Sequence, residues 1–134
     1  MYRHVVWTTW RREPLITSAL AMFLCRFLGD VARQEDARVL GLGIVSTHIH
    51  VLIRVSPTTS LPKLVQRMKG GSSVIARKEG VVTDGALKWA RAYSVHTVGG
   101  RQLDSVLSYL DAQPDHHPTE AIPEWAGGRN AALG

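Results

Sequence analysis

Residues 39–55, Val-Leu-Gly-Leu-Gly-Ile-Val-Ser-Thr-His-Ile-His-Val-Leu-Ile-Arg-Val, decide the fold of this chain. Two apolar runs rich in β-branched residues fill this stretch and are separated only by Ser46-Thr47, which predicts an antiparallel hairpin. Because successive side chains of a strand point to opposite faces, His48 and His50 should lie on the same face. We therefore expect two imidazoles to converge on one point just past the turn.

Before the hairpin, the sequence predicts one strand and one helix. Residues 2–10 are rich in valine, threonine and aromatic residues, which is typical of a half-buried strand. After Pro14, Thr17 or Ser18 can cap a helix whose apolar residues recur at helical spacing to about Arg33. The wide apolar face of this helix is expected to cover the sheet.

After the hairpin, the pattern changes to a second helix and then a fourth strand. Thr59 or Ser60 can cap this helix, and Gly70-Gly71 should weaken it and mark a bend or a close contact. Residues 89–98 are typical of a strand, and the glycine pair that follows them indicates a flexible joint.

The last predicted helix covers residues 102–113, and Pro114 should stop it. The order of elements predicts an α+β fold, with a ferredoxin-like antiparallel sheet of about four strands, helices on one face and an additional C-terminal helix. We expect one domain over residues 1–117, followed by an irregular tail at 118–134.

The charge of the chain points to a polyanionic partner. Sixteen Lys and Arg residues against eleven Asp and Glu residues give a net charge of +5 and a pI near 9.9. Such a balance favours nucleic acid over a small acidic protein. Charge alone leaves open the alternative of an ordinary basic protein.

Cysteine content and hydropathy bear on the compartment. Cys25 stands alone, so an internal disulfide or a cysteine-based zinc site is impossible, and a reducing cytoplasm fits. The longest apolar run, residues 19–28, is interrupted by Arg26 and is too short to span a bilayer. The N-terminus lacks the pattern of a secretion signal, and we expect no membrane association.

The last predicted helix adds candidate catalytic groups to the histidine pair. Tyr109 and Gln113 are four residues apart and therefore share one side of that helix. Two neutral imidazole nitrogens with room for oxygen donors suit Mg²⁺ or Mn²⁺ held jointly by protein and phosphate. Such a cation would offset the charge that develops while tyrosine attacks a phosphodiester in line. The chain has no Gly-x-x-x-x-Gly-Lys loop, so we expect no nucleotide cofactor.

Other two-histidine proteins fit the residues less well. A cupin would need a glutamate a few positions after the second histidine, where this chain has Arg54. A histidine-triad hydrolase would need a third histidine at the position of Leu52. A two-histidine phosphoesterase needs a pair of His-x-Thr/Ser motifs, which the chain does not supply. A zinc site with four protein ligands is equally unsupported.

Several blocks, taken in order, resemble the small single-tyrosine transposases of the HUH class, namely the insertion-sequence-200 type and its palindrome-associated relatives. The match extends from Tyr2 to about His117. The similar blocks are residues 2–9, His48-Ile49-His50, residues 60–70, residues 93–99 and residues 108–113.

This resemblance implies metal-dependent cleavage and rejoining of single-stranded DNA at hairpin-marked ends. It implies that Tyr109 is the nucleophile that forms a 5′-phosphotyrosine, and that His48, His50 and Gln113 bind Mg²⁺ or Mn²⁺. It also implies a homodimer, in which Gly99-Gly100 could let the tyrosine helix complete the site of the partner.

Two positions depart from the family pattern. Thr47 stands where an acidic residue is often found before the first histidine, which removes a carboxylate that could orient the histidine. Ala112 stands where asparagine is common before the glutamine. Neither change removes a predicted ligand or the nucleophile.

Basic residues of the second predicted helix are candidates for DNA binding, because phosphate contacts supply much of the affinity of such proteins. A solvated helix face is the alternative for each of them. The candidates are Lys63, Arg67, Lys69, Arg77 and Lys78.

The sequence leaves two alternatives to an active transposase. One is a domesticated protein that binds DNA hairpins without transposition activity. The other is a nickase related to replication initiators or relaxases, which would use the same chemistry.

Overall fold

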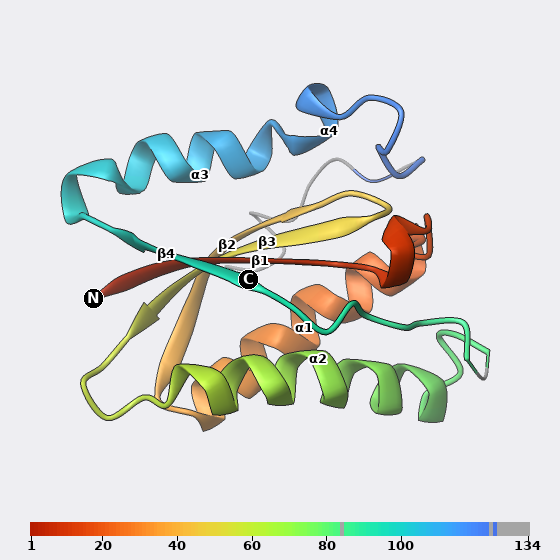
Figure 1. Cartoon of the computed structure of the whole chain (residues 1–134), viewed down its shortest axis with the longest axis horizontal. Coiled ribbons are helices and arrows are strands. Elements are labelled where there is room, and N and C mark those ends of the chain that lie inside the picture. Colours follow the sequence, from red (N-terminus) through yellow and green to blue (C-terminus); the bar gives the residue numbers. More distant parts are fainter. Residues whose placement is uncertain (84, 124, 126–134) are drawn as a thin grey trace.

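The predicted hairpin forms part of a four-stranded antiparallel sheet in the computed structural model, which describes residues 1–83, 85–123 and 125. Strand β2 (Ala37–Ile44) pairs with β3 (His48–Val55), β3 pairs with β1 (Tyr2–Thr8), and β1 pairs with β4 (Ser94–Val98). The resulting order, β2-β3-β1-β4, confirms the predicted ferredoxin-like arrangement (Figure 1).

Helices lie on both faces of this sheet. The long helices α1 (Ser18–Gln34) and α2 (Leu61–Lys78) cover one face, and α3 (Leu103–Asp111) covers the other (Figure 1). Both long helices begin at predicted cap residues: the Thr17 hydroxyl accepts a hydrogen bond from the amide of Leu20, and Ser60 does the same for Lys63. These caps fix where the chain turns onto the sheet.

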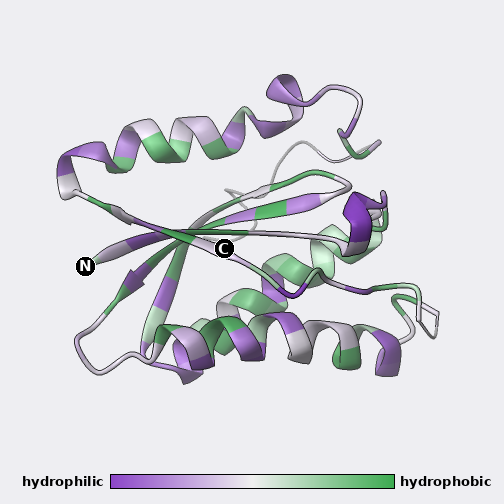
Figure 2. Cartoon of the chain, in the orientation of Figure 1, coloured by the Kyte–Doolittle hydropathy of each residue, from purple (hydrophilic) through white to green (hydrophobic). Residues whose placement is uncertain are grey.

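The main hydrophobic core fills the space between the sheet and the two long helices. Figure 2 shows hydrophobic residues along the sides of α1 and α2 that meet the strands. A smaller cluster of Leu52, Val98 and Leu110 lies under α3. Fully buried members of the main core include Val5, Leu20, Leu24, Leu28, Ile49, Val51, Ile53, Leu64 and Met68. Among the described residues, no helix is both long and apolar enough to span a bilayer.

The predicted fourth strand is shorter in the structure. The fourth strand begins at Ser94 rather than at residue 89; Trp89 makes only an isolated bridge with Thr9. Its indole instead packs edge-on against Trp7 and donates a hydrogen bond to Ser72 Oγ, so aromatic packing explains the strand-like pattern there.

Helix α2 is continuous through Gly70-Gly71, where the sequence predicted a weakened helix with a bend or a close contact. A Cβ atom at Gly71 would lie 2.9 Å from Cζ of Phe27 in α1. The glycine therefore allows the two helices to approach closely, and it does not interrupt the second one.

The last predicted helix is divided in two. Helix α3 ends at Asp111, and a short helix α4 (Gln113–His116) follows after Ala112. Pro114 lies in the first turn of α4, where its missing N–H costs no hydrogen bond, so it starts a helical turn instead of stopping one. Helix α3 and the break at Ala112 together bring Gln113, the first residue of α4, to the sheet.

Part of the predicted tail is ordered against the domain. The amide of Ser46, in the hairpin turn, donates to the carbonyl of Glu120 at 2.7 Å, and Ile122 is buried in the main core. Residues 124 and 126–134 of the predicted tail lie outside the described residues. The domain boundary at residue 117 stays a prediction.

Cys25 lies inside α1 and is 3% exposed. Burial raises the pKa of its thiol to about 12. The thiol is therefore part of the packed core.

Candidate active site

His48 and His50 lie on the α3 side of β3, as their spacing predicted. Both side chains are buried, and their ring centroids are 5.2 Å apart. The neighbouring Ile49 and Val51 point into the main core on the other face. A single strand thus supplies apolar residues to one layer and imidazoles to the other.

Two glycines of β2 allow α3 to lie close to the histidines. A Cβ atom at Gly43 would lie 2.8 Å from the carbonyl oxygen of Leu110 and 2.8 Å from Cγ of Gln113. At Gly41 it would lie 2.6 Å from a methyl carbon of Leu107. Only residues without a side chain fit at this depth, so the Gly-x-Gly spacing is a functional signal that the sequence analysis missed.

Gln113 reaches the first histidine from above the sheet. Its side chain is fully buried, and its Oε1 lies 3.3 Å from Nε2 of His48. Its Nε2 is buried without a hydrogen-bond partner. The oxygen of this buried carboxamide therefore lies next to the imidazole.

Tyr109 stands beside the second histidine. Its ring centroid is 5.7 Å from that of His50, at an interplanar angle of 80°. On its other side it stacks with His116 at 5.2 Å. With 42% of its surface exposed, Tyr109 is both next to the histidine pair and open to a large substrate.

Each histidine of the pair is held through its Nδ1 atom. Nδ1 of His50 lies 2.8 Å from Nε2 of His4, and Nδ1 of His48 lies 3.0 Å from Oγ1 of Thr47. These contacts leave the Nε2 atoms of both rings available for another ligand. They also fix the orientation of each ring.

Burial keeps both imidazoles neutral. It lowers the pKa of His50 to about 3, and the neighbouring His4, His48 and His117 act in the same direction. Burial also lowers the pKa of His48, although Gln113 and Glu120 oppose it. Neutral imidazoles carry the lone pairs that metal binding requires.

The donor set fits a hard divalent cation that is also bound by other oxygens. Adjacent ligands of an octahedral cation, each about 2.1 Å from it, are about 3 Å apart, close to the 3.3 Å between His48 Nε2 and Gln113 Oε1. When Nδ1 of His48 carries the proton, the lone pair on Nε2 of His48 faces a lone pair on Oε1 of Gln113. A cation between these two atoms would be attracted by both. In the described part of the chain, no group of three or more His, Cys, Asp or Glu side chains could hold a metal ion. Water or substrate would therefore complete the coordination.

The remaining four histidines lie around the pair, and the sequence analysis connected none of them to the site. The ring of His96 is 6.2 Å from that of His4. In the structure His4 binds His50, His116 stacks on Tyr109, and the ring of His117 lies 5.0 Å from that of His48. The alternation of Tyr2, His4 and Val6 on β1 is the signal that could have placed His4.

The candidate DNA-binding residues of α2 lie on the opposite face of the sheet from Tyr109 (Figure 1). Lys63 and Arg67 form ion pairs with Glu35 at 3.5 and 3.0 Å. Nζ of Lys69 donates to the carbonyl oxygens of residues 90, 91 and 92. Three of the five cations thus already stabilise contacts within the chain, and their role in DNA binding stays a prediction.

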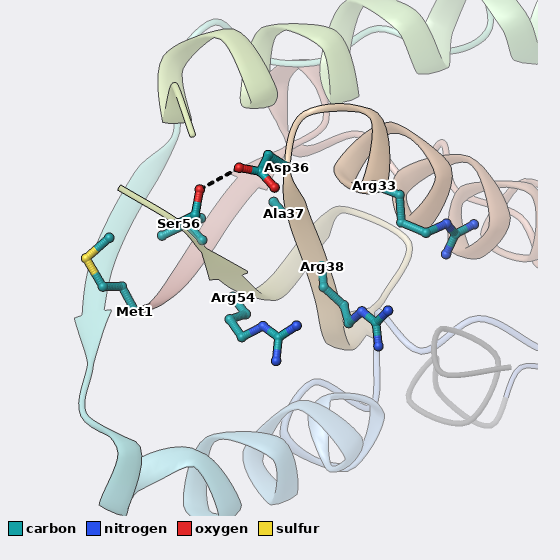
Figure 3. A pocket seen from close by; sticks show the side chains of 8 residues that line it. Met1, Arg33, Asp36, Ala37, Arg38, Arg54 and Ser56 are labelled. Carbon is teal, nitrogen blue, oxygen red and sulfur yellow. Dashed lines mark hydrogen bonds between the residues drawn. The ribbon is translucent and has the colours of Figure 1, made fainter. Parts of the chain in front are cut away.

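A second group of cations lines a hollow of about 370 Å³ at the far end of β2 and β3. Figure 3 shows Arg33, Arg38 and Arg54 around it. Arg38 and Arg54 are directly opposite each other in the sheet register. Arg33 pairs with Asp30, whereas neither of the other two forms an ion pair with another described residue. Two facing cations of this kind favour an anion between them.

The fold and the site define a small α+β protein that presents a tyrosine and a carboxamide from one helical segment to two histidines of a central strand. The family model described as "Transposase IS200 like" matches residues 1–113. The chain therefore belongs to the IS200-like transposase family, a family of DNA-processing enzymes.

Individual relatives agree with this membership. The ISDra2 transposase TnpA of Deinococcus radiodurans is 25% identical over 119 residues, which cover 84% of this chain and 83% of that protein. A crystal structure of a Deinococcus radiodurans R1 protein assigned as a transposase has a TM-score of 0.67 at 23% identity, covering 84% of this chain and 90% of that one.

A second similar structure is a REP-associated tyrosine transposase bound to a REP hairpin. Its TM-score is 0.63 at 14% identity, and the match covers 87% of this chain and 67% of that one. At this identity the likeness shows a shared fold.

Proposed function

We propose that this protein cleaves and rejoins single-stranded DNA at hairpin-marked ends, through a 5′-phosphotyrosine on Tyr109. Mg²⁺ or Mn²⁺ would be held by His48, His50 and Gln113. One observation carries the proposal: the tyrosine and the carboxamide of the α3–α4 segment meet the two buried histidines of β3 within one chain.

Tyr109 is suited to attack because it is half exposed and its ring is fixed between two imidazoles. Its phenolic oxygen would attack the phosphorus in line and form the new phosphorus–oxygen bond as the bond to the 3′ oxygen breaks. The phenol proton would leave to solvent, and the departing 3′ oxygen would take one up. The reverse reaction with another 3′ hydroxyl rejoins the strand, so no external energy source is needed.

The neutral imidazoles of His48 and His50 and the amide oxygen of Gln113 would bind the cation. When bound, the cation would stabilise the negative charge that develops on the phosphate oxygens. His4 and Thr47 would hold the two rings in the orientation this requires.

Two observations support hairpin DNA as the substrate: the net charge of +5 of the chain, and its similarity in fold to a transposase bound to a REP hairpin. Arg38 and Arg54 are candidates for contacts with the phosphate backbone, because no other described residue neutralises them. We also retain a homodimer in the proposal, with Gly99-Gly100 before α3 as the joint that would allow helices to be exchanged.

The test uses a labelled hairpin oligonucleotide with single-stranded flanks, incubated with the protein and Mg²⁺ or Mn²⁺. A covalent adduct should appear on a denaturing gel. Tyr109→Phe should abolish the adduct but keep hairpin binding. His48→Ala combined with His50→Ala should also lose cleavage.

Tyr93→Phe is the matched control, because Tyr93 is similarly exposed, at 39%, but lies near Lys69 and away from the histidines. It should form the adduct at wild-type yield. An adduct of unchanged yield in Tyr109→Phe would reject the assignment of the nucleophile.

A further inference from the structure

The described part of the tail brings a carboxylate to the outer side of His48. Oε2 of Glu120 lies 3.6 Å from Nδ1 of His48 and accepts a hydrogen bond from the Thr47 hydroxyl. Glu120 is 73 residues away from Thr47 in sequence. This is the side of the imidazole opposite to the atom that faces Gln113.

The hydrogen bonds form a directed chain. A carboxylate can only accept, so the Thr47 hydroxyl must donate to Glu120. The lone pairs of Oγ1 then remain to accept from Nδ1–H of His48, which lies at 3.0 Å. With its proton on Nδ1, the ring keeps a lone pair on Nε2, the atom nearest to the amide oxygen of Gln113.

Main-chain contacts fix Glu120 in this place. Its carbonyl accepts from the amide of Ser46 at 2.7 Å, and its amide donates to the carbonyl of His117 at 2.9 Å. Ile122, two residues further on, is 4% exposed in the core. The main-chain hydrogen bonds of Glu120 and the burial of Ile122 therefore hold the backbone that carries the carboxylate in place.

Two further basic side chains lie next to the Glu120 carboxylate. Nη2 of Arg12 lies 3.4 Å from Oε2, and Nδ1 of His117 lies 3.6 Å from Oε1. The side chain of Glu120 is 24% exposed, whereas that of His48 is 6% exposed. The Glu120 carboxylate thus lies at the rim of the site, next to a buried ring.

We propose that Glu120 is a positioning residue for cation binding: acting through Thr47, it holds His48 in the tautomer that leaves Nε2 free to bind the metal. The inference rests on the proposed function for the identity of the bound group. The proposal also explains the threonine at position 47. Glu120 of the tail supplies the carboxylate that an acidic residue at this position would otherwise provide. Partners of this kind typically change metal affinity by about 10–100-fold.

The experiment measures Mn²⁺ binding to the DNA-free full chain by electron paramagnetic resonance, and the His48 tautomer by ¹⁵N NMR of the imidazole. Glu120→Ala should weaken Mn²⁺ binding about 10–100-fold and shift the His48 tautomer population away from Nδ1–H. Asp115→Ala is the matched control: it removes one exposed carboxylate from the same segment and should change neither readout.

A rescue variant separates positioning from a structural role. Thr47→Asp combined with Glu120→Ala puts a carboxylate directly next to Nδ1 without restoring the tail contacts. It should recover most of the lost Mn²⁺ affinity. Glu120→Gln, which keeps the shape and the acceptor oxygen, should retain the tautomer and lose part of the affinity, and it remains informative if Glu120→Ala does not fold.

The two proposals fail in different ways. An unchanged His48 tautomer and unchanged Mn²⁺ affinity in Glu120→Ala, with a wild-type protein that binds Mn²⁺, would overturn the role of Glu120. A wild-type protein that neither binds Mn²⁺ nor forms an adduct would overturn the proposed function, and the tautomer measurement would still test whether Glu120 orients His48.

Discussion

The two faces of the sheet are built from the same strands and yet differ in almost every physical respect. On one face, α1 and α2 close a continuous apolar core, and charged residues such as Glu35 and Arg67 pair with each other. On the other face, α3 buries a small cluster around Leu110, and polar groups fill the remaining surface. The face with less packing carries the candidate site.

The difference arises within each strand. On β3, Ile49, Val51 and Ile53 belong to the core, while His48, His50 and Arg54 alternate with them on the side of α3. A slip of one residue in the pairing would move imidazoles into the core and isoleucines into the site. The core therefore fixes the register on which the site depends.

The largest expected effect is a loss of stability on the face of the sheet that α1 and α2 cover. Leu24→Ala removes a fully buried side chain from α1 and should lower the free energy of unfolding by about 2–5 kcal/mol, measured by urea denaturation. Adduct formation per folded molecule should stay unchanged, because Leu24 does not contact the site. Met22→Ala, at a position of the same helix that is 61% exposed, is the control and should change stability by less than about 0.5 kcal/mol.

A smaller loss of stability but a larger loss of function is expected where α3 meets β2. Gly43→Ala places a methyl group 2.8 Å from both the Leu110 carbonyl oxygen and Cγ of Gln113, so α3 must move outward. Overpacking of this kind costs about 1–3 kcal/mol. Adduct yield should fall at least tenfold, because Gln113 and Tyr109 move together with the helix.

The control for this substitution lies on the other face. Gly70→Ala, on the exposed side of α2, meets nothing within 4 Å and should raise stability by about 0.5–1 kcal/mol through its effect on helix propensity. Equal adduct yields for Gly43→Ala and Gly70→Ala would show that close docking of α3 is not needed, and the contrast between the faces would lose its functional meaning.

The smallest effect is electrostatic. The hydrogen bond from Arg67, with help from Lys63, lowers the pKa of Glu35 below its ordinary value. The native state therefore binds a proton at Glu35 less readily than the unfolded state does. The ionised Glu35 carboxylate stabilises the native state at pH values above the pKa that Glu35 has in the unfolded chain. This stabilisation is lost as the pH falls through the lower pKa that Glu35 has in the native state. Glu35→Gln should therefore flatten the acid limb of a stability-versus-pH curve, whereas Glu79→Gln, at an exposed position after α2, should leave it unchanged.

Much of the fold could be predicted because its signals are local. The bounds of β3 and the cap at Ser60 follow from a two-residue period and from side-chain hydrogen bonding, which need no knowledge of distant residues. The end of α3 at Asp111 was missed because Pro114 is tolerated inside the first turn of a new helix as readily as after the end of an old one.

The site was only partly predictable, because its remaining members come from distant parts of the chain. The roles of His48, His50, Gln113 and Tyr109 were proposed from spacing and resemblance, and the structure brings these four together. His4 lies 46 residues from His50 in sequence, and Glu120 lies 73 residues from Thr47, through which it reaches His48. Gly43 is required because α3 packs directly on it, and the sequence around Gly43 does not show which helix will pack there.

The burial of Cys25 makes the native chain equivalent to a cysteine-free protein for chemical labelling. A thiol that is 3% exposed, with a pKa of about 12, stays inert to maleimides while the protein is folded. Ser105→Cys, on the exposed side of α3, would then accept a fluorophore at one defined place. Energy transfer between differently dyed copies would report how close the α3 helices of two copies lie to each other.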